Sequence, residues 1–238
     1  MVISIIQPCF VPWLGYFEQI ALADIFVYMD DVDYTKKDWR NGNQLKSPYG
    51  IKNIGFPVKK CLRHTPLKNV EISYNSPWED HLFNQIHSWY SKSPYYQEII
   101  DIIKPVIYSK FPGLVELNFH LNNAILDYLN IKTPIFFSSD IERNTSDKVD
   151  RIVELCKHFN GVDVLFDGKK AQDFLEANYL LQHDIKVVFQ DYQHKPYQQL
   201  WGDFVPYMSI LDLLMNHGKE SLQYILTISI EQKLQNNP

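Results

Sequence analysis

The sequence has few cysteines, few glycines and no long apolar run. Its 238 residues include three cysteines, at Cys9, Cys61 and Cys156, and nine glycines. The cysteines are scattered without metal-ligand spacing, which argues against a disulfide framework and indicates a reducing compartment. No apolar run approaches the roughly 20 residues that span a bilayer, and the first residues do not form a signal-peptide pattern. We therefore expect a cytoplasmic protein without a membrane span.

Several common site motifs are also missing. The eight histidines are dispersed and form no HExxH, so no metal site is predicted. Neither GxGxxG nor GxxxxGK[ST] occurs, which argues against the usual dinucleotide and P-loop fingerprints. Ser209 lies in no GxSxG, which argues against a serine hydrolase. The net charge of −5 argues against non-specific binding to nucleic acid or anionic membranes.

The hydrophobic pattern, by contrast, is clear. Short apolar runs predict strands at 2–6, 25–29, 133–140, 162–166 and 185–190, and amphipathic stretches predict helices at 14–23, 147–159 and 170–180. This alternation is typical of a parallel, Rossmann-like α/β sheet with helices on both faces. Residues 39–58 predict a β-hairpin, or paired extended segments, around Pro48 and Gly50, and residues 70–73 are a candidate further strand.

Helices fill the rest of the chain. We predict a helical insert at 77–91, 95–109 and 114–130, in which Pro105 kinks or splits the second helix. Two C-terminal helices are expected at 206–217 and 218–227. The whole is one domain, 1–238, with an α/β core of about 1–75 and 133–205, an insert of about 76–132 and C-terminal helices of about 206–230.

A heavy turn between the first strand and the first helix is the first candidate site. It runs IIQPCFVPWLGYFEQ and contains Gln7, Pro8, Phe10, Trp13, Gly15 and Tyr16. Gly15 begins the helix, and backbone N–H groups at a helix N-terminus bind phosphate or carboxylate. The alternative is that Pro12, Trp13 and Tyr16 merely brace a tight corner. In such sheets ligands bind beyond the carboxyl ends of the strands, where this turn lies. A ligand site and a braced corner therefore both stay open as interpretations of the turn.

The second candidate is DDVDYTKKDWRNGNQLK, which follows the second strand. Cations mixed with amides and aromatic rings suit a phosphorylated, ring-bearing ligand, whereas the alternative is a solvated charged loop. The candidate residues are Asp30, Asp31, Tyr34, Lys36, Lys37, Trp39, Arg40, Asn41, Asn43 and Lys46.

A third candidate lies near the end of the chain, in YQQLWGDFVPYMSILDLLMNHG. Ser209, Asp212 and Asn216 recur at i, i+3 and i+7, which places three polar groups along one helix face. Such a stripe lines a cleft, or it hydrogen-bonds neighbouring loops in the core. The pattern favours neither interpretation.

Both ends of the chain resemble the WbqC-like family. The resemblance is carried near the start by QPCFVPWLGYFEQIALADIFVYMDDVDYTKKDWRNGN, which spans the first candidate and most of the second, and near the end by YQQLWGDFVPYMSILDLLMNHG. This chain departs from the family pattern at Gly42, where Arg or Lys is usual, and at Asp167–Lys170, where a Ser-Gly and a glycine-rich turn are usual. The resemblance implies a bacterial or archaeal protein connected with surface polysaccharides, including O-antigen sugars. A more distant similarity is to HIGH-superfamily nucleotidyltransferases such as pantothenate synthetase, in which His stands where this chain has Tyr16.

These observations lead to a transferase or ATP-dependent ligase as the first hypothesis. It would carry out nucleotide-dependent acyl (aminoacyl included) or nucleotidyl transfer to a sugar, with ATP and Mg²⁺ as candidate cofactors. Lys36, Arg40 and Asp31 are the candidate catalytic residues. The expected partner is a nucleotide-sugar, an amino sugar or a carboxylic or amino acid, and a homo-oligomer stays open. The alternative is a non-catalytic protein that binds a nucleotide-sugar or a glycosyltransferase, and a metal-dependent hydrolase ranks third.

Overall fold

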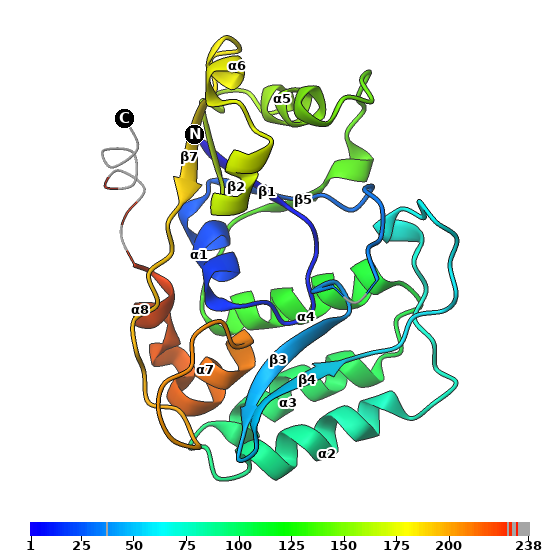
Figure 1. Ribbon diagram of the computed structural model, residues 1–238, viewed down its shortest axis with the longest axis vertical. Coiled ribbons are helices and arrows are strands. Elements are labelled where there is room, and N and C mark those ends of the chain that lie inside the picture. Colours follow the sequence, from blue (N-terminus) through cyan, green and yellow to red (C-terminus); the bar gives the residue numbers. More distant parts are fainter. Residues whose placement is uncertain (37, 228, 230–231, 233–238) are drawn as a thin grey trace.

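A five-stranded parallel sheet with helices on both faces forms the upper half of the molecule, and a separate β-hairpin lies below it (Figure 1). The computed structural model describes residues 1–36, 38–227, 229 and 232. The strands are β1 (Val2–Ile6), β2 (Ile25–Tyr28), β3 (Gly42–Ser47), β4 (Gly50–Gly55), β5 (Ile135–Phe137), β6 (Val164–Gly168) and β7 (Lys186–Gln190). The helices are α1 (Leu14–Leu22), α2 (Trp78–Tyr90), α3 (Tyr96–Tyr108), α4 (Leu114–Tyr128), α5 (Lys148–His158), α6 (Ala177–Leu181), α7 (Ile210–His217) and α8 (Leu222–Ile225).

The strand order explains where a ligand site is expected. The sheet runs β5-β2-β1-β6-β7, and every neighbouring pair is parallel. From β1 the chain first builds outward through β2 to β5, and then returns to place β6 and β7 on the other side of β1. The order therefore reverses between β1 and β6, and open α/β sheets bind ligands beyond the carboxyl ends of the strands at this point.

Each face of the sheet has its own core. Ile3, Ile5 and Val27 pack with the apolar residues of α5 and α6, whereas Phe26 and Tyr28 pack with α1 and α4. Alternate residues of β2 thus enter opposite cores, as the two-residue period of a strand requires. Both faces are covered, which explains why β1 and β2 are continuous apolar runs. The predicted α/β class is confirmed.

The hairpin and helices α2 to α4 also match the predicted pattern. β3 pairs with β4 in antiparallel register from Gly42↔Gly55 to Ser47↔Gly50. Gly50 has a φ of +90°, which the turn between the strands requires and most side chains disfavour. The predicted split of the second helix at Pro105 is wrong, since α3 continues through it. Pro105 is exposed and lies in the last turn of α3, where few residues follow.

Three other local predictions are wrong. Residues 170–180 form a 3₁₀ helix at Lys169–Asp173 and the short α6, because the chain bends at Phe174 so that both Leu175 and Leu180 reach the core. Residues 70–73 make isolated bridges to Val58 and Gly113 and no strand. The C-terminal helices are also shorter than predicted: α7 begins at Ile210, and a 3₁₀ turn precedes α8. Residues 228 and 230, which fall in the C-terminal helical segment predicted at about 206–230, lie outside the described residues.

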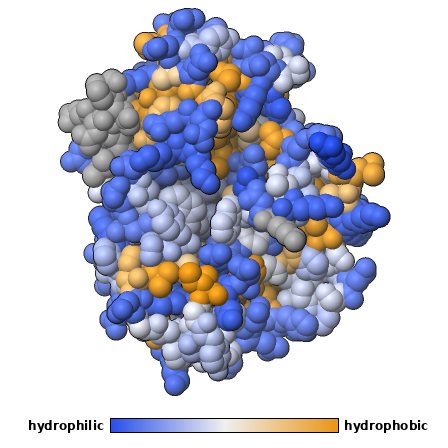
Figure 2. Space-filling model, in the orientation of Figure 1, coloured by the Kyte–Doolittle hydropathy of each residue, from blue (hydrophilic) through white to orange (hydrophobic). Residues whose placement is uncertain are grey.

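The surface is polar on the face shown in Figure 2. Hydrophilic residues cover most of this face, and apolar residues form separated patches. In the part of the chain that the structure describes, no helix combines the length and the apolar composition needed to cross a membrane.

Candidate functional site

The carboxyl ends of the five parallel strands carry hydrogen-bonding side chains. Gln7 follows β1, Asp30 lies beyond β2, Ser138 follows β5, Asp167 lies near the end of β6 and Gln190 ends β7. Three of the predicted site residues, Gln7, Asp30 and Asp31, therefore lie at this edge of the sheet.

Trp13 explains the need for glycine at the start of α1. A Cβ on Gly15 would lie 2.3 Å from the Trp13 ring, which rests directly on the first turn of the helix. The indole is itself packed edge-on against Tyr192, with a centroid distance of 5.1 Å, and lies 5.5 Å from the ring of Tyr207. Because Trp13 covers Gly15, this geometry favours bracing of the turn over an open phosphate site at Gly15.

Tyr16 and the first residues of the turn point inward. The Tyr16 hydroxyl donates to the Gln7 carbonyl oxygen at 3.1 Å, and burial raises the pKa of this phenol well above its usual value. Pro8 and Phe10 are buried. The Asn43 side-chain amide donates to the carbonyls of Phe10 (3.0 Å) and Val11 (2.9 Å). Asn43 thus holds the turn against β3.

Arg40 reaches the end of β1 from the segment before β3. Its Nε donates to Gln7 Oε1 at 2.6 Å, its Nη1 lies 3.0 Å from Cys9 Sγ, and its Nη2 lies 3.6 Å from Asp38. A guanidinium has five N–H donors, so these contacts leave some of them for a ligand. The side chain is 16% exposed. We call Gln7, Cys9, Asp38, Trp39 and Arg40 the strand-end cluster.

The neighbours of Arg40 differ in exposure. Trp39 is 49% exposed, and its carbonyl accepts from the Phe10 N–H. Lys36 is exposed as well, and Lys37 lies outside the described residues. The Tyr34 hydroxyl donates to Asn41, whose amide donates to the Phe56 carbonyl at 2.8 Å. Tyr34 and Asn41 therefore support the loop that presents Trp39 and Arg40.

Asp30 and Asp31 occupy different surroundings. Asp30 is buried, and its two carboxylate oxygens accept hydrogen bonds from the backbone N–H and the hydroxyl of Ser139. Asp31 forms ion pairs with Arg143 and with Arg151, the latter at 3.0 Å. Asp30 thus ties β2 to the end of β5, while Asp31 holds two arginines together. The arginines were not predicted as site residues, although Arg143 shortly follows the carboxyl end of a predicted strand.

The predicted residues Lys46 and Asp212 are far apart in the chain, yet both belong to one buried network of hydrogen bonds. Lys46 Nζ donates to Gln199 Oε1 at 3.2 Å and to the carbonyls of Gly202 and Asp203. The Gln199 amide donates to Asp212 at 2.8 Å. Asp212 also accepts from two phenols, and its pKa is raised by burial. We call the set the buried network: Lys46, Tyr90, Tyr197, Gln199 and Asp212.

Ser209 and Asn216 are engaged with the chain itself. Ser209 caps α7, and its hydroxyl donates to the Val11 carbonyl at 2.7 Å. The Asn216 amide donates to the Asp212 carbonyl one turn earlier. The polar stripe of α7 thus contacts the opening turn and the core. Tyr90, Tyr197 and Gln199 were missed because their spacing along the chain gives no sign that they meet.

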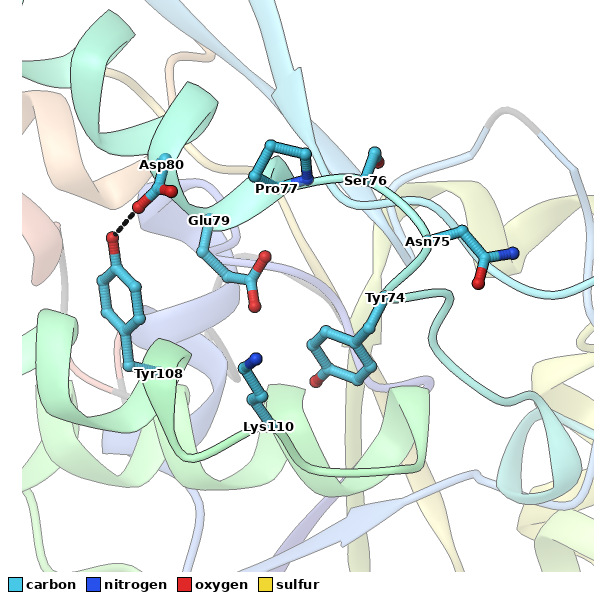
Figure 3. A pocket seen from close by; sticks show the side chains of 8 residues that line it. All are labelled: Tyr74, Asn75, Ser76, Pro77, Glu79, Asp80, Tyr108 and Lys110. Carbon is cyan, nitrogen blue, oxygen red and sulfur yellow. Dashed lines mark hydrogen bonds between the residues drawn. The ribbon is translucent and has the colours of Figure 1, made fainter.

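A separate cavity of about 320 Å³ lies at the start of α2 (Figure 3). In Figure 3 the side chains of Glu79 and Lys110 point toward each other across it, and the Tyr108 hydroxyl donates to Asp80. None of the predicted site residues lines this cavity. The described residues also contain no group of three His, Cys, Asp or Glu side chains placed to hold a metal ion.

The fold and the strand-end cluster together define a Rossmann-like α/β protein with a candidate ligand site at the carboxyl edge of its sheet. The model of the WbqC-like protein family matches residues 7–224. The chain therefore belongs to the WbqC-like family. It is 34% identical over 226 residues to a Mycobacterium tuberculosis (strain ATCC 25618 / H37Rv) protein named "Uncharacterized protein Rv1507c", and the match covers 94% of this chain and 96% of that protein. No solved structure matches the chain significantly.

Proposed function

We propose that the protein is a nucleotide-dependent transferase or ligase of surface-polysaccharide or amino-sugar biosynthesis. It would transfer an acyl, aminoacyl or nucleotidyl group to a sugar in the cytoplasm. The chain belongs to the WbqC-like family, and resemblance to that family implies a connection with surface polysaccharides. Family membership therefore supports this part of the proposal. The reaction class is the part of the proposal that rests on the site.

The placement of Arg40 carries the proposal. The Arg40 guanidinium is fixed at the carboxyl end of β1 by Gln7, its side chain is partly exposed, and the preceding residue, Trp39, is 49% exposed. Guanidinium N–H groups bind phosphate oxygens in a planar, two-point geometry, and an aromatic surface stacks a base or sugar ring. In group transfer from a nucleotide, the remaining N–H groups of Arg40 would stabilise the charge that develops on phosphoryl oxygens. The exposed Lys36 would add a second cation.

ATP and Mg²⁺ fit this site only in part. Mg²⁺ is usually held by one or two carboxylates plus substrate phosphates. Both oxygens of Asp30 already accept hydrogen bonds, and Asp31 is paired with two arginines. The contacts of Asp30 and Asp31 therefore favour a structural role for both carboxylates. Mg²⁺ would enter the site already bound to the nucleotide phosphates.

Turnover assays with an Arg40→Lys variant test the proposal. The protein is incubated with ATP, Mg²⁺ and a panel of amino sugars or nucleotide-sugars, each with amino or carboxylic acids, and AMP and pyrophosphate are measured. We expect a product with at least one pair. Arg40→Lys should lower kcat at least about 100-fold, because an ammonium group cannot reproduce the planar two-point contact of a guanidinium with phosphate.

The matched control is Lys52→Gln, which removes an exposed cation from β4. It should keep wild-type turnover. Full activity of Arg40→Lys would refute the role of Arg40. Absence of any product, together with thermal stabilisation by a nucleotide-sugar, would replace the enzyme with the alternative, a non-catalytic nucleotide-sugar-binding protein.

A further inference from the structure

A cavity of about 440 Å³ lies beyond the carboxyl ends of β2 and β5, and no residue of the strand-end cluster lines it. We call it the arginine pocket, and its walls are formed by Asp31, Ile141, Arg143, Thr145, Ser146 and Arg151. One wall is the irregular segment that joins β5 to α5 (Figure 1), and another is the first part of α5. Small-molecule sites typically have volumes of about 300–1,000 Å³. The pocket is therefore large enough for a small molecule as well as a single ion.

Asp31 fixes both guanidinium groups at the wall of the pocket. Its Oδ1 lies 3.0 Å from Arg151 Nη2, and its Oδ2 pairs with Arg143. The Ser138 hydroxyl donates to the same carboxylate at 2.7 Å. Because three donors hold Asp31, the two arginines are kept side by side before any ligand binds.

Arg143 has donor capacity that the protein does not use. Its side chain is only 10% exposed, and its Nη1 is buried without a hydrogen-bond partner among the described residues. A buried donor left unpaired costs about 1–3 kcal/mol, and more when the group is charged. Since Arg143 also lines the pocket, a ligand oxygen bound there would supply an acceptor that the chain does not.

Charged groups of both signs surround the pocket. Its lining contains two guanidinium groups and one carboxylate. Asp30 and Glu154 also lie near Arg143, so the surroundings as a whole carry no positive excess. Neither of these two carboxylates belongs to the lining: the oxygens of Asp30 accept from Ser139, and Glu154 accepts from the Asn144 N–H. The lining itself therefore offers two guanidinium groups, and the unpaired donor of Arg143, rather than net charge, favours an anionic acceptor.

We propose that the arginine pocket binds the phosphate group of a small phosphorylated molecule, such as a sugar phosphate. Arg143 and Arg151 donate to the phosphate oxygens, since guanidinium groups match phosphate geometry. The hydroxyl groups of Thr145 and Ser146 lie in the same lining and hydrogen-bond the phosphate or the hydroxyls of its substituent. This site does not depend on the proposed transfer reaction.

Calorimetric titration at constant ionic strength tests the site, with inorganic phosphate, glucose 1-phosphate and glucose as probes. The two phosphates should bind and glucose should not. Arg143→Gln should weaken phosphate binding at least about tenfold, the effect of one lost charged hydrogen bond. Ser146 is exposed at the mouth of the pocket, so Ser146→Trp should block binding without removing a charge or disturbing the core.

Two controls separate this site from other sources of binding. Lys157→Gln removes a cation from the far end of α5 and should bind phosphate within about twofold of wild type. Arg40→Lys should also bind normally, which distinguishes failure of this site from failure of the proposed function. The proposal is overturned if neither phosphate binds wild type, or if Ser146→Trp binds both as wild type does. The Ser146→Trp measurement tests the proposal even if Arg143→Gln fails to fold.

Discussion

Arg40 and Lys46 lie six residues apart, yet the structure gives these two cations opposite surroundings. Arg40 keeps N–H groups beyond its contacts with Gln7, Cys9 and Asp38, and it follows the exposed Trp39 in the chain. Lys46 donates to three oxygens of its own chain, which uses all three donors of an ammonium group. Arg40 can therefore bind a ligand at no cost to the fold's own hydrogen bonds, and Lys46 cannot.

The comparison shows that hydrogen-bond saturation separates a binding group from a supporting one. Both cations come from one charged stretch, and residue type does not distinguish them. Gln199 completes the buried network because its amide accepts from Lys46 and donates to Asp212. Among the described residues, nothing comparable accepts from the remaining N–H groups of Arg40. The buried network should therefore govern stability, and the strand-end cluster should govern binding.

The largest expected effect is on the buried network. Asp212→Ala leaves the hydroxyls of Tyr90 and Tyr197 without their acceptor and removes one of the acceptors of the Gln199 amide. We expect the free energy of unfolding to fall by about 3–5 kcal/mol, as when a buried polar or charged partner is removed. Chemical denaturation monitored by circular dichroism measures this change.

Asn216→Ala serves as the control, because it removes the hydrogen bond to the Asp212 carbonyl on the same helix and a long one, of 3.5 Å, from the Ser93 hydroxyl. It should cost about 1 kcal/mol. If Asp212→Ala is no more destabilising than this control, the buried network is not a stabilising unit and the comparison with Arg40 loses its basis.

The parallel sheet was predictable because its signals are local. Continuous apolar runs such as 2–6 and 25–29 require burial on both faces, and Pro48 with Gly50 marks the hairpin turn. The 170–180 segment failed because the burial of Leu175 and Leu180 overrides a helical pattern. Sequence reasoning also placed Gln7, Asp30 and Asp31 at the carboxyl edge, where the structure has them.

Saturation of hydrogen bonds was not predictable. It depends on partners distant in the chain, such as Gln199 for Lys46 and Arg143 for Asp31. The covered Gly15 is similar, since the orientation of the Trp13 ring decides whether the helix N-terminus is open. Residue types therefore indicated which edge of the sheet carries polar groups. Three-dimensional contacts were needed to distinguish the groups that are free to bind a ligand from those that support the fold.

A smaller effect is expected at a third strand end, where burial raises the pKa of Asp167 to about 6. The native state then binds more protons than the unfolded chain between about pH 4 and 6, so this group's contribution to stability is lost as pH rises through that window. Asp167→Asn keeps an acceptor for the Gly168 N–H. It should raise the free energy of unfolding by about 1–3 kcal/mol at pH 7.5 and by almost nothing at pH 4.

Urea denaturation at both pH values measures this difference. Asp184→Asn is the matched control, because Asp184 is exposed and its positive φ of 63° suits asparagine. Its effect should stay within about 0.5 kcal/mol at either pH. A gain for Asp167→Asn that is equal at pH 4 and pH 7.5 would contradict an ionisation effect.

The smallest expected effect on stability is at Trp39, and it gives the sharpest test of the comparison. Trp39→Ala keeps the backbone hydrogen bond to Phe10 and removes a half-exposed ring, so the free energy of unfolding should change by no more than about 0.5 kcal/mol. Loss of a stacking surface should weaken nucleotide-sugar binding about five- to hundredfold. Tyr49→Ala, at the 82% exposed tip of the hairpin, should change neither quantity. Unchanged binding in Trp39→Ala would remove the ring from the site, and a loss of stability above 1 kcal/mol would make Trp39 a supporting residue like Lys46.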